Sequence, residues 1–284
     1  MTNQQTKVQH YIPRFILKKF LNSGSLNFFD KRYKKFLPKT PTGSMYGEYF
    51  YEHDDFNPNE IEDLLKTRET IYAPLVDKII SKGKLTLQEH ETLIEFRHVT
   101  YYRSNEFVGF HTYKKDRGGG GSDQRSDWRR INGIFELGNL EEDIKRSQLR
   151  AIQDVINRKD AAYQMSALTP ICIVYTASDR KFAIGDNGSI SIGEEFDGVA
   201  VIVISPSHAL IFPKARTALE LMGKVGATNQ VSTIEYREID NDFVDIINRC
   251  VCERAFEYYI DPNINVSSSI EVGSKKSPEK PMGA

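Results

Sequence analysis

The sequence is poor in cysteine, in long apolar runs and in net charge. Its three cysteines, Cys172, Cys250 and Cys252, are too few for a disulfide framework, which favours a reducing compartment. No stretch approaches ~20 uncharged apolar residues, the length that a membrane-spanning helix needs. Residues 1–10 are polar and lack the apolar segment of a secretion signal. We therefore expect a cytoplasmic protein that makes no contact with a membrane.

The ionisable residues nearly balance, with 38 Lys and Arg against 39 Asp and Glu and a formal net charge of -1. Hydrophobic residues make up 39% of the 284-residue chain and aromatic residues 11%, which is enough for a sizeable core. These values exclude the disordered and collagen-like classes of protein. The length fits one large domain, or one domain with a helical subdomain.

The balanced total conceals an uneven distribution of charge along the chain. Residues 1–40 carry nine basic side chains and one acidic one, whereas residues 41–80 carry nine acidic and three basic ones. Basic groups interleaved with aromatic rings suit contacts with the backbone and bases of a nucleic acid. A hairpin with solvated lysines and core-facing rings is the alternative interpretation. The aromatic residues in question are Phe28, Phe29, Tyr33 and Phe36.

Hydrophobic periodicity divides the chain into helices followed by strands. Apolar residues at helical spacing predict helices at 10–21, 57–83, 86–114, 140–165 and 241–259. Short runs of β-forming residues between turn residues predict strands at 25–30, 46–51, 171–175, 181–184, 199–204 and 210–212. Strands and helices do not alternate, so the predicted class is α+β, with several long helices packed with an antiparallel sheet in the C-terminal half.

We expect a single α+β domain over residues 1–260. Its expected parts are an N-terminal basic helix with strands (1–56), a helical part (57–165) and a sheet with the final helix (166–260). Residues 116–126 contain four consecutive glycines and a serine, which predicts a flexible loop, either natural or inserted as a linker. Residues 261–284 are rich in Ser, Lys and Pro and are expected to form a mobile tail.

Polar residues interrupt the apolar stripes of several predicted helices. Glu69 and Glu62 lie on one face of their helix, seven residues apart. Arg97 and Arg103 fall among apolar residues of the next helix, and Asn248 among those of the last. A buried charge without a partner costs several kcal/mol, so these groups should contact one another, a ligand or a metal. A purely structural Glu–Arg pair between packed helices is the alternative.

A second candidate site is the loop at 185–188, directly after a predicted strand. Asp186 and Asn187 there either hold a catalytic carboxylate or cap a turn through their own side chains. Common catalytic motifs are otherwise absent. The sequence has no GxxxxGK phosphate loop, no CxxC or HxxxH zinc pair and no GxSxG hydrolase turn.

The opening motif resembles that of a known family. The segment HYIPRFILKKF at 10–20 is similar to the HYxPRFxLxxF start of the bacterial domain of unknown function 4238. The resemblance covers about residues 8 to 260. One departure is Gly188, because the family usually places proline after its Asp-Asn pair, which predicts a looser loop here. The later segments that follow the order of the family are 28–31, 49–51, 61–62, 69, 103, 185–187, 204–206 and 248.

The resemblance implies an intracellular bacterial protein, often found in mobile or accessory gene settings, and supplies no established reaction. A defence or toxin role follows by family analogy alone. Several candidate residues coincide with motif positions of the family. These are His10, Glu62, Glu69, Arg103, Asp186, Asn187 and Asn248.

The leading hypothesis is a nuclease-like hydrolase acting on a nucleic acid or nucleotide. His10, Glu69 and Asp186 are the expected catalytic residues, with His10 as a general acid or base. Glu62 and Glu69 are the expected ligands of a divalent cation such as Mg²⁺. Arginine at the site would stabilise phosphate charge, and the basic N-terminal segment would guide the polyanion. The residues expected to bind substrate are Arg14, Arg103, Asn187 and Asn248.

The rival hypothesis is a non-enzymatic module that binds nucleic acid or a partner protein. In that case Glu69, Arg103 and Asn248 form a buried polar lock that fixes the helices. Geometry separates the two hypotheses, because an enzyme needs His10, Glu69 and Asp186 to converge. Mutation separates them too, since Glu69→Ala abolishes turnover without unfolding in an enzyme and lowers the melting temperature of a lock.

Overall fold

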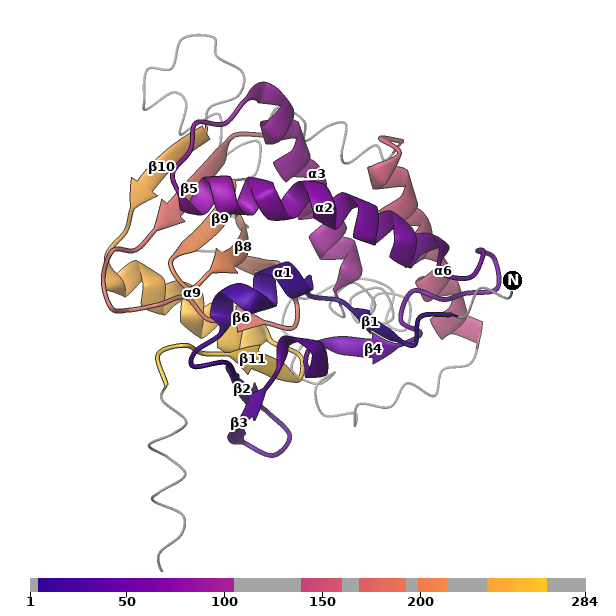
Figure 1. Cartoon of the computed structure of the whole chain (residues 1–284), viewed down its shortest axis with the longest axis horizontal. Coiled ribbons are helices and arrows are strands. Elements are labelled where there is room, and N and C mark those ends of the chain that lie inside the picture. Colours follow the sequence, from indigo (N-terminus) through magenta and orange to yellow (C-terminus); the bar gives the residue numbers. More distant parts are fainter. Residues whose placement is uncertain (1–4, 105–138, 160–168, 193–198, 214–233, 265–284) are drawn as a thin grey trace, which may run out of the picture.

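The computed structural model describes residues 5–104, 139–159, 169–192, 199–213 and 234–264 (Figure 1). The predicted Gly-rich loop at 116–126 and nearly all of the predicted tail lie outside the described residues. Helices and three separate sheets make this an α+β fold, which confirms the predicted class. The helices are α1 (Arg14–Leu17), α2 (Glu60–Ile80), α3 (Leu87–Arg103), α6 (Asn139–Ile156) and α9 (Asn241–Arg254), and the 3₁₀ turns are η1 (Lys18–Phe20) and η2 (Pro41–Gly43).

The strands of the largest sheet come from the C-terminal half, but the sheet is mixed, and the strand predicted at 181–184 contributes β6 to another sheet instead. Its antiparallel pairs are β5–β9, β9–β8 and β8–β7, whereas β10 pairs with β5 in parallel. The prediction of a purely antiparallel sheet was therefore wrong. In spatial order its strands are β10 (Ile234–Glu238), β5 (Ile171–Tyr175), β9 (His208–Phe212), β8 (Val199–Ser205) and β7 (Ile190–Ile192).

A second sheet brings the two ends of the fold together. Two adjacent strands come from the N-terminal part and two from the C-terminal part, all paired antiparallel, and in Figure 1 the sheet lies below α1. Two short strands near the N-terminus, β1 (Val8–His10) and β4 (Tyr46–Glu48), form a third sheet. In spatial order the strands of the second sheet are β3 (Lys35–Lys39), β2 (Leu26–Asp30), β11 (Tyr258–Ile260) and β6 (Ile184–Gly185).

The first and last predicted helices were too long. The chain is extended at His10, and α1 begins only at Arg14, because Pro13 fixes its own φ and disfavours helical backbone in the residue before it. At the other end, α9 ends at Arg254, and the residues that follow pair as β11 with β2 and β6. Sheet pairing therefore overrides the helical pattern there.

The central helices begin close to their predicted positions, but two of them are shorter than predicted. α3 ends at Arg103 rather than at 114, and α6 ends at Ile156 rather than at 165. The capping box of α3 is formed, with Thr86 accepting from the main chain of Glu89 while the Glu89 side chain accepts from the main chain of Thr86. α3 packs on the large sheet through His90, which contacts the main-chain oxygen of Thr169 at 2.9 Å. Arg97 of the same helix places its guanidinium 5.3 Å from the ring of Phe212.

One hydrophobic cluster runs through the helices and both larger sheets. Fully buried members include Leu17 of α1, Ile61 of α2, Ile173 of β5 and Ile247 of α9. An ion pair joins α2 to α3, where the buried carboxylate of Glu95 accepts from Arg68 at 2.5 and 2.6 Å. Side-chain packing and this pair together fix the helices that carry the candidate site.

Candidate functional site

Arg103 is the centre of a buried polar cluster. It is the last residue of α3, and its side chain is 3% exposed. The guanidinium donates from Nε to the hydroxyl of Tyr51 (3.0 Å), from Nη1 to Oε1 of Glu69 (2.8 Å) and from Nη2 to the main-chain oxygen of His10 (2.6 Å). One cation therefore joins α3 to α2, to the end of β1 and to the segment after β4.

Tyr51 is the member of this cluster that sequence reasoning missed. Its hydroxyl accepts from Arg103 and donates to the main-chain oxygen of His10 at 3.0 Å. Burial raises the pKa of Tyr51 to about 12, so the hydroxyl keeps its proton near neutral pH. The one signal for Tyr51 in the sequence is its place in the 49–51 motif segment.

Glu62 lies two helical turns before Glu69 on α2. Its carboxyl group is 12% exposed, and the ammonium of Lys66 lies 3.8 Å away. Burial has the largest influence on the pKa of Glu62 and raises it to about 7, against the opposing charges of Arg103 and Lys66. Glu62 is therefore a carboxyl group that gains and loses its proton near neutral pH.

Glu69 has a different environment, because Arg103 holds its carboxylate in a direct ion pair. Its side chain is 25% exposed, so one edge of the cluster reaches solvent. Glu62 and Glu69 are the predicted Mg²⁺ ligands, and the charge of Arg103 acts on both of them. Within the described ranges, no group of three or more His, Cys, Asp or Glu side chains is arranged to hold a metal ion.

The ring of His10 has a defined tautomer. Its Nε2 lies 3.0 Å from the main-chain oxygen of Pro41, and a carbonyl only accepts, so Nε2 carries the proton and Nδ1 is the bare nitrogen. Among the described residues Nδ1 makes no hydrogen bond, and it does not belong to the buried atoms that lack a partner. Burial lowers the pKa of His10, and the cations Arg14 and Arg103 lower it further. The imidazole is therefore neutral at pH 7 and has an accepting nitrogen open to solvent.

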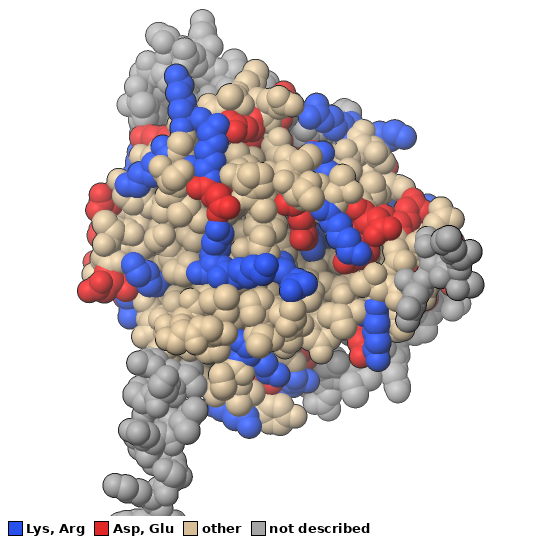
Figure 2. Space-filling model, viewed as in Figure 1, with Lys and Arg blue, Asp and Glu red and all other residues tan. Residues whose placement is uncertain are grey.

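Arg14 is an exposed cation four residues after His10. It begins α1, it makes no ion pair among the described residues, and its charge acts on the His10 ring. Lys18 is also exposed, one helical turn later. Figure 2 shows a row of Lys and Arg side chains across the face of the molecule where Figure 1 places α1 and η1.

Asp186 is fully buried and bound to the main chain. Its carboxylate accepts from the N–H groups of Phe256 (2.7 Å), Glu257 (2.6 Å) and Tyr258 (3.0 Å), where the chain leaves α9 and enters β11. Burial raises the pKa of Asp186 to about 6, although these three donors oppose the shift. Asn187 also binds main chain, donating to the oxygen of Arg254 at 2.5 Å.

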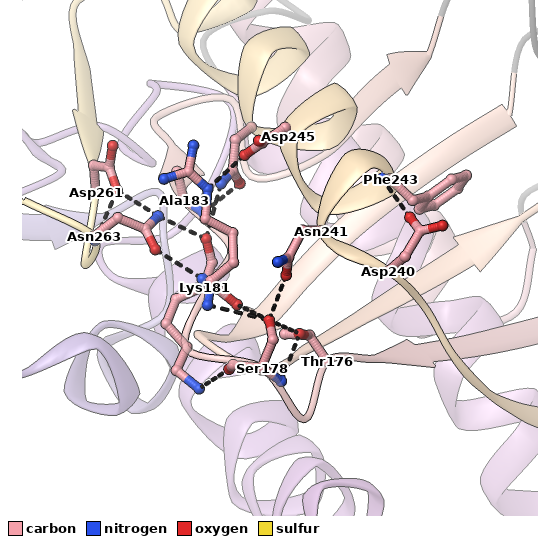
Figure 3. A network of polar contacts seen from close by, with 12 residues as sticks. Thr176, Ser178, Lys181, Ala183, Asp240, Asn241, Phe243, Asp245, Asp261 and Asn263 are labelled. Carbon is pink, nitrogen blue, oxygen red and sulfur yellow. Dashed lines mark hydrogen bonds and ion pairs between the residues drawn. The ribbon is translucent and has the colours of Figure 1, made fainter.

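Asn248 holds the segment before β6. It accepts from the main-chain nitrogen of Ala183 at 2.7 Å and donates to the main-chain oxygen of Lys181 at 2.8 Å. Figure 3 shows the surrounding network, in which Asn263 exchanges two hydrogen bonds with the main chain of Lys181. The amide of Asn248 therefore attaches α9 to the strand that leads into the Asp186 loop.

The predicted site residues thus fall into two groups. His10, Glu62, Glu69 and Arg103 converge, whereas Asp186, Asn187 and Asn248 bind the main chain around β6, α9 and β11. The convergence of His10, Glu69 and Asp186 that an enzyme was expected to need is therefore not found, and Asp186 is not part of the site around Arg103. Asp186 lies near the segment that follows His10, because its charge helps to raise the pKa of Tyr11.

Gly188 also lies near the segment that follows His10. Its φ of +67° is closed to proline, and a Cβ there would lie 3.0 Å from Ile12 and from Thr100. The loop is therefore packed rather than loose, contrary to the prediction.

Comparison with known proteins gives one match. The model of a family described as a protein of unknown function, DUF4238, matches residues 8–261. No curated protein and no solved structure matches the chain. Among the helices of the described residues, none is long and apolar enough to cross a membrane.

Proposed function

The chain belongs to the DUF4238 family, to which no reaction is assigned, and from the site of this member we propose a nuclease-like hydrolase that uses general acid–base catalysis. One observation carries the proposal. Glu62 and His10, at the same cluster, have pKa values shifted in opposite directions, that of Glu62 up to about 7 and that of His10 down. Such opposed shifts distinguish the acid from the base in many hydrolytic sites.

The two groups have complementary proton-transfer roles. Neutral His10 takes the proton of the attacking hydroxyl or water at Nδ1, the atom that its bond to Pro41 leaves bare. Protonated Glu62 gives its proton to the oxygen that leaves phosphorus. One P–O bond forms and one breaks, and both protons are accounted for. Arg103 fixes the main chain of His10, and its charge favours the anionic transition state.

Surface charge supports a polyanionic substrate. Arg14 and Lys18 are exposed beside the site and make no ion pair within the described residues. Phosphate groups are the natural partners of such unpaired cations. We therefore propose a nucleic acid as substrate, with Arg14 as its first phosphate contact.

A bacterial defence or toxin setting, such as antiphage defence, is part of the proposal by family analogy only. A nuclease of that kind works in the cytoplasm, where its targets are. The three cysteines are free, which is compatible with a reducing compartment.

A second candidate function is a binding module without catalysis. The observation in its favour is that the Arg103 guanidinium already donates to Tyr51, Glu69 and His10, as a structural lock would. In this case the exposed cations bind nucleic acid or an acidic partner protein, and Glu62 and His10 only complete the packing around the lock.

A cleavage assay tests the hydrolase. Parent protein, Glu62→Gln and the matched control Asp63→Asn are incubated with total RNA and with plasmid DNA, in magnesium and in EDTA. We expect the parent to degrade one of the two nucleic acids. Glu62→Gln should be about 100-fold slower at equal folded fraction, because the amide has no proton to give. Asp63 is an exposed neighbour on the same helix, so Asp63→Asn should match the parent.

Intact RNA and DNA in every lane would refute the hydrolase. Equal cleavage by parent and Glu62→Gln would refute the assigned role of Glu62. The two metal conditions separate two roles of Glu62, because a carboxyl group that binds Mg²⁺ is ionised and cannot be the general acid. The acid role predicts cleavage in EDTA, whereas loss of cleavage in EDTA would favour Glu62 and Glu69 as ligands of Mg²⁺.

A further inference from the structure

The β2–β3 hairpin carries cations that the proposed hydrolytic site does not use. Residues 31–34 form its turn, in which Lys34 takes a left-handed φ of 51°. In Figure 1 the hairpin projects from the lower edge of the molecule, and Figure 2 shows Lys and Arg side chains there.

Hydrogen bonds from Asp30 and Lys31 hold the main chain of the turn in place. The carboxylate of Asp30 accepts from the main-chain nitrogens of Arg32 (2.9 Å) and Tyr33 (3.3 Å). Lys31 turns inward and donates to the main-chain oxygen of Ala255 at 2.8 Å, just after the end of α9. These bonds fix the main chain of the turn, so the side chains that project from it start from a defined position.

The projecting side chains are one aromatic ring and several lysines. Tyr33 is 66% exposed. The guanidinium of Arg32 lies 5.7 Å and the ammonium of Lys35 lies 5.4 Å from the centre of its ring. Lys34, Lys35 and Lys39 are exposed and make no ion pair in the described part of the chain. Their positive charge is therefore not neutralised within that part of the protein.

Tyr33 differs from the other three aromatic residues of the basic block. Phe28 is 3% exposed and belongs to the core. Phe29 packs between Phe36 and Tyr259, at 4.8 and 4.7 Å between ring centres. Phe29 and Phe36 are half-buried and do not belong to the hydrophobic cluster of the core. Core-facing rings, one of the two interpretations of the sequence, are therefore confirmed for Phe28 only. Of the four rings, that of Tyr33 is the most exposed.

We propose that Tyr33, Lys34 and Lys35 bind single-stranded nucleic acid, with one unpaired base stacked on the Tyr33 ring and the two lysines on flanking phosphates. A base inside a duplex has both faces covered by its neighbours, so a ring at a hairpin tip reaches only unpaired bases. The inference rests on the proposed function only in taking nucleic acid as the ligand. It adds that the nucleic acid is single-stranded and that the turn of the β2–β3 hairpin holds it.

Fluorescence anisotropy with a labelled oligothymidine of about ten nucleotides tests this proposal. The titrations are run over a series of salt concentrations, and the probe is checked for cleavage on a gel afterwards. Tyr33→Ala should weaken binding about tenfold, whereas Tyr33→Phe should bind as the parent does, because stacking needs the ring and not the hydroxyl. The same probe paired with its complement should bind more weakly and should not respond to Tyr33→Ala.

The lysines are tested through the salt dependence of binding. Lys34→Gln/Lys35→Gln should reduce the slope of log affinity against log salt by about 1.4, or 0.7 for each phosphate contact on a single strand. The control Lys84→Gln/Lys159→Gln removes the same charge from exposed positions elsewhere. An equal effect of the control pair, or unchanged binding by Tyr33→Ala, would overturn the proposal. Absence of cleavage alongside Tyr33-dependent binding would refute the hydrolase and leave this inference standing.

Discussion

Replacing Arg103 with methionine is expected to cost the protein about 4 kcal/mol of unfolding free energy. Methionine preserves much of the buried volume and removes all three hydrogen bonds. The Tyr51 hydroxyl and the Glu69 carboxylate would then lose their cationic partner inside the protein. A buried ion pair loses most when one partner is removed, because the remaining charge is left without compensation. Urea unfolding followed by circular dichroism measures the loss.

Two further variants make this result specific. Arg14→Met removes an exposed arginine without an ion pair among the described residues, and it should change stability by no more than about 0.5 kcal/mol. Arg103→Lys keeps the charge but offers one ammonium in place of the planar guanidinium. Its unfolding free energy should therefore lie between those of Arg103→Met and the parent. A loss below about 1 kcal/mol for Arg103→Met would contradict the role of Arg103 as the bond between α3, α2 and β1.

The isosteric change Asp186→Asn is expected to cost about 3 kcal/mol. The carboxylate accepts three main-chain N–H groups, and two of them, from Glu257 and Tyr258, share Oδ2. An amide has only one oxygen, so its NH₂ group must face at least one of these donors in a fully buried site. The amide protons of residues 256–258 should then exchange faster with solvent, which hydrogen exchange measured by mass spectrometry or NMR detects.

Asp179→Asn is the matched control, because Asp179 is exposed on the same part of the chain. An unchanged unfolding midpoint for Asp186→Asn would contradict the account of this loop. The variant also separates two roles of Asp186. If folded Asp186→Asn cleaves nucleic acid at the parental rate, Asp186 fixes the turn after α9 and takes no part in the chemistry.

Local signals in the sequence were sufficient for several elements. The strand at Ile171–Tyr175 has the predicted bounds, because it is a short, continuous run of buried β-forming residues. The helices α2 and α3 follow from apolar residues at helical spacing. In these cases the preference of the segment and its tertiary environment agree.

Elements that depend on distant partners were not predictable in this way. β10 has mostly exposed side chains, and only its parallel pairing with β5 makes it a strand. β11 follows directly on a helix, and its partners β2 and β6 come from far earlier in the chain. β11 is three residues long, Tyr258–Ile260, and shows no alternation of apolar and polar residues, so a local pattern extends the helix through Tyr259.

The same distinction applies to the candidate site. Apolar stripes on two helices indicated that Glu69 and Arg103 should find a partner, and the structure pairs them directly. The other two acceptors of Arg103 could not be predicted from the sequence, because one is a main-chain oxygen and the other is the hydroxyl of Tyr51, which lies in a loop. The raised pKa of Glu62 likewise depends on how deeply α2 is buried at that residue, which the sequence does not determine.

The dependence of cleavage rate on pH tests the central claim most directly, namely that neutral His10 and protonated Glu62 act together. The account predicts a bell-shaped profile for the parent. The rate rises with pH as His10 loses its proton, at a pKa below the usual 6.5, and falls as Glu62 loses its proton at about 7. The residual rate of Glu62→Gln should lack the falling limb. A rate that keeps rising through pH 8, or a falling limb that persists in Glu62→Gln, would contradict the account.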